Sequence, residues 1–106
     1  MRSILFILFL LFTPATLGDE VASDVTVLQI NAKWNTRNDL NLNNLRGCEV
    51  KYGFLEHQTE EFQNKIKYVP VVVIYKGSRP VRQWSADLTF TLDVSLSEIQ
   101  SEVNKL

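Results

Sequence analysis

Cysteine and histidine are almost absent from this chain of 106 residues, which contains only Cys48 and His57 of these two types. A single cysteine cannot form an intramolecular disulfide, and one cysteine with one histidine cannot make a Cys/His zinc cluster. The sequence therefore predicts a domain without a disulfide framework, and we expect neither a metal nor another cofactor.

Basic charge is not in excess either. The chain has 11 lysine and arginine residues against 12 aspartate and glutamate residues, which gives a formal net charge of -1. Nucleic-acid-binding domains carry a basic footprint, and this composition has none. We therefore expect no nucleic-acid partner.

Long apolar runs are lacking except at the N-terminus, where Ile4 to Phe12 is unbroken. Arg2 precedes this run, and Pro14, Thr16 and Gly18 follow it. A basic residue, a short apolar segment and small residues at its end are the order of a secretory signal peptide. A membrane span is the alternative, but it needs about 20 apolar residues.

The sequence thus predicts a signal peptide over residues 1–18 that is cleaved after Gly18. The mature chain then covers residues 19–106, is exported to the periplasm or the cell exterior, and has no stable membrane span. Its length suits one small domain.

Seven elements are predicted for the mature chain. Apolar and alternating patterns favour strands over 25–32, 48–54, 69–75 and 80–84. Thr59 is expected to cap one helix and Ser95 another, with Leu96, Ile99, Val103 and Leu106 on one face of the second. Residues 35–47 are rich in asparagine, which weakens a helix, so a short helix ending at Gly47 is expected there. Residues 85–94 fit either an extra strand or a packed loop.

The order β-α-β-α-β-β-α is that of an α/β domain with a central mixed sheet flanked by helices. Within this order, two segments resemble the thioredoxin family. Val27 to Trp34 resembles the first core strand of that family, which runs into a tryptophan just before the active-site C-x-x-C motif. Tyr68-Val69-Pro70 and the apolar strand after it resemble the cis-proline segment. The resemblance implies a single thioredoxin-like domain over 19–106 with a cis bond at Pro70.

The departures from this family bear on the chemistry. The positions of C-x-x-C read Asn35, Thr36, Arg37 and Asn38, and the buried acid of the family falls at Gln29. Disulfide exchange needs a thiolate to attack and a second thiol to resolve the mixed disulfide. The resemblance is therefore to a degenerate member, in which the usual thiol–disulfide oxidoreductase activity is not expected.

Three functional hypotheses are open. The first is a non-redox module that binds a protein or an extended peptide at a face formed by Trp34, Asn35, Thr36, Arg37, Asn38, Tyr68, Val69 and Pro70. The second is a single-cysteine redox protein acting through Cys48. The third is a subunit of a larger assembly.

Individual residues also have two interpretations each. Trp34 either faces a ligand or packs, and Arg37 either binds an anion or is solvated. Cys48 is either a small buried side chain or a reactive thiol. His57 is expected in a surface loop.

Overall fold

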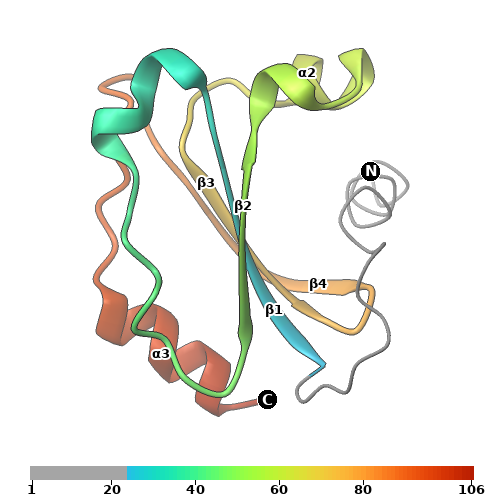
Figure 1. Ribbon diagram of the computed structural model, residues 1–106, viewed down its shortest axis with the longest axis vertical. Helices are drawn as coiled ribbons and strands as arrows, with labels where there is room; N and C mark the ends of the chain where they lie inside the picture. Colours follow the sequence, from blue (N-terminus) through green and yellow to red (C-terminus); the bar gives the residue numbers. More distant parts are fainter. Residues whose placement is uncertain (1–23) are drawn as a thin grey trace.

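The computed structural model describes residues 24–106, drawn in colour in Figure 1. The predicted signal peptide, its cleavage after Gly18 and the start of the mature chain at Asp19 lie outside the described residues.

Four strands of residues 24–106 form one sheet in the order β2-β1-β3-β4. Strand β1 pairs in parallel with β2 and antiparallel with β3, and β3 pairs antiparallel with β4. The predicted mixed sheet is therefore confirmed. Residues 71–75 of β3 are all buried, as expected for a strand covered on both faces. The strands are Val25–Asn31 (β1), Glu49–Phe54 (β2), Val71–Lys76 (β3) and Arg79–Ser85 (β4).

The two faces of the sheet have separate apolar clusters. Helix α3 (Leu96–Asn104) and the chain between β1 and β2 cover one face, where Leu42, Leu45, Ile99 and Val103 are buried. Helix α2 (Glu60–Lys65) lies on the other face, where Phe62 is buried. Figure 1 shows these elements on opposite sides of the sheet. The predicted layers are thus confirmed.

Both predicted helix caps are present. The Thr59 hydroxyl accepts a hydrogen bond from the Phe62 N–H, and the Ser95 hydroxyl accepts one from the Glu98 N–H. The Glu98 carboxylate lies 3.8 Å from Arg82. Leu106 was predicted on the apolar face of the last helix, but it lies beyond the helix end and is exposed.

The helix predicted over 35–47 is the main error. The structure has a 3-10 helix, η2 (Lys33–Asn38), followed by an irregular segment. An asparagine side chain competes with helical backbone bonds here, because the Asn43 N–H donates to Asn41 Oδ1. The Asn38 amide adds a bond between side chains, to Asn35 Oδ1. Gly47 has a positive φ of 77°, but it follows this irregular segment rather than a helix.

The open choice at residues 85–94 is also decided. Ser85 ends β4, and residues 86–95 form turns and a loop. A second 3-10 turn, η3 (Leu55–His57), follows β2.

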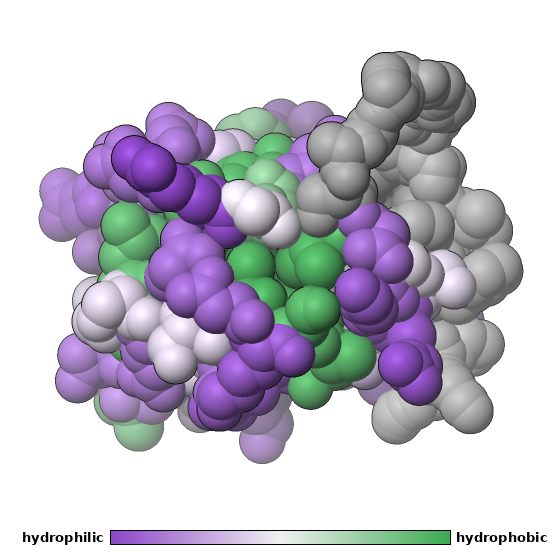
Figure 2. Space-filling model, turned by 90° about the horizontal axis from the view of Figure 1, so that it is seen from below, coloured by the Kyte–Doolittle hydropathy of each residue, from purple (hydrophilic) through white to green (hydrophobic). Residues whose placement is uncertain are grey.

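Within residues 24–106, no helix is both long enough and apolar enough to cross a bilayer. On the face of the molecule shown in Figure 2, apolar residues lie near the centre and hydrophilic residues lie around them.

Candidate functional site

Three loops meet at one end of the sheet. Helix η2 follows the end of β1, Pro70 precedes the start of the antiparallel β3, and the 86–91 loop follows the end of β4. The Asn35 side chain joins all three, because its Nδ2 lies 3.2 Å from the Val69 carbonyl oxygen and 3.1 Å from that of Phe90.

Asn35 is almost fully buried, with 4% of its surface exposed. Its Nδ2 also lies 2.9 Å from Asn31 Oδ1, and its Oδ1 accepts from the Asn38 amide at 2.8 Å. The Asn31 amide in turn donates to the Asn35 carbonyl and to Asp39 Oδ1. An amide can donate and accept at once, so Asn35 connects polar groups that burial would otherwise leave unpaired.

Gln29 is buried on β1 and anchors the start of the irregular segment. Its Nε2 donates to the Leu40 carbonyl and its Oε1 accepts from the Leu40 N–H, both at 2.9 Å. A carboxylate at this position could accept from the N–H but could not donate to the carbonyl. The glutamine is therefore matched to a backbone pair.

Three aromatic rings, Trp34, Tyr68 and Phe90, form an aromatic cluster where the loops meet. The ring centroids of Trp34 and Phe90 are 5.0 Å apart, and those of Tyr68 and Phe90 are 5.6 Å apart, both in edge contacts. Trp34 is 64% exposed. The aromatic cluster therefore exposes the Trp34 ring to solvent, while Phe90 contacts both Trp34 and Tyr68.

Phe90 is the site residue that sequence reasoning missed. It has a φ of 60°, uncommon for a bulky residue, and its N–H donates to the Asp87 carbonyl at 2.9 Å. The Asp87 carboxylate also accepts from the Thr89 N–H and hydroxyl. An Asp-x-Thr turn before an aromatic residue was the available signal, but its partner loops are distant in sequence.

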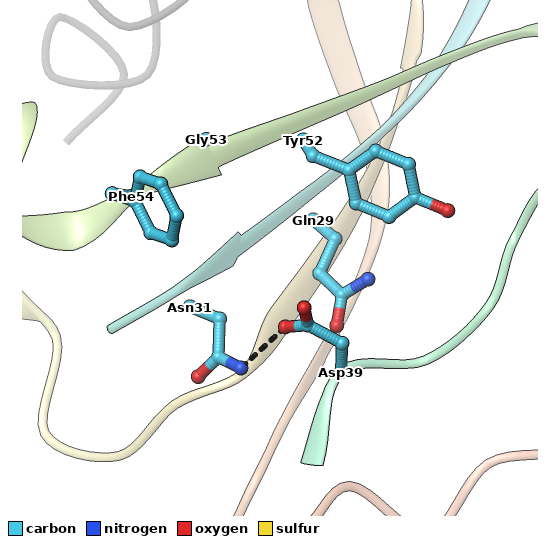
Figure 3. Close-up of a pocket in the computed structure, with 6 residues that line it drawn as sticks. All are labelled: Gln29, Asn31, Asp39, Tyr52, Gly53 and Phe54. Atoms are coloured by element: carbon cyan, nitrogen blue, oxygen red, sulfur yellow. Dashed lines mark hydrogen bonds between the residues drawn. The ribbon is translucent and has the colours of Figure 1, made fainter. Parts of the chain in front are cut away.

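A separate cavity of about 100 Å³ lies beside β1 and β2. Figure 3 shows the Tyr52 and Phe54 rings projecting from β2, with the Gln29 and Asn31 side chains extending from β1 toward Asp39. Within residues 24–106, no group of three or more His, Cys, Asp or Glu side chains is placed to hold a metal ion.

The architecture is similar to that of solved thioredoxins. A malaria-parasite thioredoxin-2, described as a component of the protein secretion machinery of that parasite, is 16% identical, with a TM-score of 0.62 over 84% of this chain and 89% of its own. A mutant thioredoxin from Halobacterium salinarum is 11% identical, with a TM-score of 0.56 over 78% of this chain and 74% of its own. The chain has a thioredoxin-like fold.

A third similar structure, the thioredoxin of Fasciola hepatica, has 16% identity and a TM-score of 0.51 over 78% of this chain and 81% of its own. No protein-family model and no curated protein sequence matches. At these identities the similarity shows the fold alone. The resemblance to thioredoxins read from the sequence is confirmed at that level.

The thioredoxin-like fold brings the predicted face together, but burial divides it. Trp34, Thr36 and Arg37 are exposed, whereas Asn38 and Tyr68 are half-buried. Asn35, Val69 and Pro70 are buried. The Val69–Pro70 bond is cis, as the resemblance implied. The Val69 carbonyl already accepts one hydrogen bond from Asn35, which occupies one of its two acceptor positions.

Cys48 lies away from this face. It directly precedes β2, whose first residue Glu49 pairs with Thr26 near the start of β1, while η2 follows the far end of β1. Cys48 is half-buried against the α3-side cluster, and burial raises the pKa of its thiol. His57 is exposed, as predicted, with its ring against Phe54.

Proposed function

We propose that this thioredoxin-like domain is a non-redox module that binds a protein or an extended peptide. The aromatic cluster carries the proposal, because it holds an exposed tryptophan at the place where the predicted face is assembled. Thr36 and Arg37, both exposed on η2, add hydrogen-bond donors beside Trp34.

The physical support is the combination of area and rigidity. Tryptophan, tyrosine and arginine are the residue types that most often carry binding energy at interfaces. The hydrogen bonds of Asn35 hold η2 against Val69 and Phe90, so the aromatic cluster is ordered before a ligand arrives. Pre-organisation of this kind lowers the entropic cost of binding.

A binding experiment tests this proposal directly. Peptides are selected from a displayed library of extended sequences on the immobilised protein, and their affinities are measured by calorimetry. Trp34→Ala is expected to weaken binding at least about tenfold, because truncating a central aromatic anchor commonly costs about 2 kcal/mol. Tyr68→Ala should weaken it as well.

The matched control is Val81→Ala, which removes an exposed apolar side chain on β4 and should leave affinity unchanged. Circular dichroism must show that each variant is folded. The proposal fails if no peptide is selected, or if folded Trp34→Ala and Tyr68→Ala both bind as tightly as the unmodified protein.

The single-cysteine alternative lacks a supporting observation. Thiolates are the reactive form, and burial that raises the pKa of Cys48 lowers the thiolate fraction at neutral pH. We expect no insulin reduction above the background of free thiol and an unchanged peptide affinity for Cys48→Ser. Insulin reduction above that background, lost in a Cys48→Ser protein of undiminished stability, would favour the redox alternative instead.

We also propose that the protein is exported, with the mature chain beginning at Asp19. The support is the order of charge, apolar run and small residues in the first 18 residues. Intact-mass measurement of the exported protein tests this. A product that still contains Ile4 to Phe12 would contradict it.

A further inference from the structure

We propose that the cavity beside β1 and β2 binds a cationic group, an ammonium or a guanidinium. None of its lining residues belongs to the aromatic cluster, so the proposal is independent of peptide binding there. The lining residues are Gln29, Asn31, Asp39, Tyr52, Gly53 and Phe54.

Two walls of the cavity are aromatic. Tyr52 and Phe54 are two residues apart on β2, so their side chains lie on the same side of the sheet, as Figure 3 shows. Tyr52 is 45% exposed and Phe54 is half-buried, so the rings can be reached from solvent. Aromatic ring faces attract cations through their quadrupole, and rings grouped around a small space favour ammonium groups.

The only formal charge among the six lining residues is the carboxylate of Asp39. Its Oδ1 accepts from the Asn31 amide at 2.6 Å, which fixes the orientation of the carboxylate. Within residues 24–106, its other oxygen has no hydrogen bond and is available to a ligand. Charge-assisted hydrogen bonds of this kind are among the stronger polar interactions, and they favour a cation over a neutral ligand.

The charges around the cavity permit a cation. Lys33 Nζ lies 5.6 Å from the centroid of the Phe54 ring, so this wall already takes part in a cation–π contact. Lys33 also adds a like charge nearby, which an incoming cation must tolerate. The Glu56 carboxylate accepts from the backbone N–H of Lys33 at 3.0 and 3.1 Å. Its negative charge offsets the positive charge of the Lys33 side chain.

The size of the cavity limits the ligand. Its volume is about 100 Å³. An apolar cavity of about 150 Å³ holds benzene, so this one suits a head group of a few heavy atoms. A lysine or arginine side chain of a partner, or a small free amine, supplies such a group.

The test is an NMR titration of the nitrogen-15-labelled protein with methylguanidinium or methylammonium chloride. Amide signals of Asp39, Gly53 and Phe54 should shift, with dissociation constants in the millimolar range for such small probes. Methylurea, the neutral analogue of methylguanidinium, should leave the same signals in place. The proposal fails if neither cation shifts these signals or if methylurea shifts them equally.

Variants assign the interaction to its residues. Asp39→Asn keeps an oxygen that accepts from Asn31 but removes the charge, and it should weaken cation binding about tenfold. Phe54→Leu should also weaken it, whereas Asp93→Asn, which removes an exposed carboxylate elsewhere, should not. Unchanged affinity in a folded Asp39→Asn protein would overturn the proposal.

Two further arms separate the sources and the sites. A capped Gly-Arg-Gly peptide that shifts the same signals at lower concentration than methylguanidinium identifies a partner side chain as the ligand, and the reverse order identifies a free amine. Trp34→Ala should leave the titration unchanged. Loss of cation binding in folded Trp34→Ala would show that the cavity is not an independent site and would contradict the proposal.

Discussion

At the scale of single residues, two buried amides connect segments of the chain around β1. Asn35, which the resemblance places at the first cysteine position, is buried and connects Asn31, Val69 and Phe90 through its side chain. Gln29, which the resemblance places at the position of the family's buried acid, pairs with both backbone groups of Leu40. At both places an amide supplies a donor and an acceptor together, which a carboxylate or a thiolate could not do.

Asn35→Ala is expected to lower the free energy of unfolding by about 2 kcal/mol or more, because it leaves several buried polar groups without partners. Urea unfolding followed by circular dichroism measures this. Asn64→Ala is the control, since Asn64 is exposed in α2 and alanine favours a helix. Equal stability of the two variants would mean that the Asn35 bonds contribute little.

At the scale of elements, the two covers of the sheet are unlike each other. On one face, α3 buries Ile99 and Val103 beside Leu42 and Leu45 of an irregular segment. Because that segment has few backbone bonds of its own, its position depends on these contacts and on Gln29. The Arg46 backbone adds two bonds with the Gln100 side chain of α3, at 2.8 and 2.9 Å. Helix α3 therefore also stabilises the irregular segment between β1 and β2.

Removing the cap of α3 tests the importance of this helix. Ser95→Ala is expected to cost about 1 kcal/mol of folding stability, because the Glu98 N–H loses its side-chain acceptor and keeps only the Ser95 carbonyl. Thermal unfolding gives the measurement. Ser101→Ala changes an exposed serine inside the same helix and should be neutral or slightly stabilising. A melting temperature for Ser95→Ala equal to that of Ser101→Ala would contradict the role of the cap.

At the scale of the whole molecule, the central strands are buried on both faces and global stability depends on them. Tyr75 on β3 is 1% exposed, and this burial raises the pKa of its phenol to about 12, against about 10 in the unfolded chain. Between these values the unfolded chain loses the phenolic proton while the folded protein retains it. The contribution of Tyr75 to stability is therefore complete below pH 10 and is lost as the pH rises toward 12.

We expect the free energy of unfolding to fall by about 1.4 kcal/mol per pH unit between pH 10 and 12 because of Tyr75. Other groups titrate in this range as well, so the measurement is the difference between the unmodified protein and Tyr75→Phe. Urea unfolding at a series of pH values provides it. A difference that stays constant from about pH 9 to 12 would contradict the assignment.

Much of the architecture was decided by local patterns in the sequence. The nearly continuous apolar run before Lys76 predicted a central strand, because such a strand buries side chains on both faces of the sheet. Thr59 and Ser95 predicted where the two helices begin. Asn35 and Asn38, at the positions that resemble the C-x-x-C motif, led to the expectation that the usual redox chemistry is missing. These features depend on neighbours within a few residues, which a sequence displays directly.

Only the tertiary structure decided the rest. Helix propensity did not reveal that residues 39–48 are irregular, because their place is determined by contacts with β1 and α3. It did not reveal Phe90 either, which meets Trp34 and Tyr68 only when three loops converge. The cavity beside Asp39 likewise needs β2 next to β1. Such sites arise between segments distant in sequence, and their geometry exists only once the chain is packed.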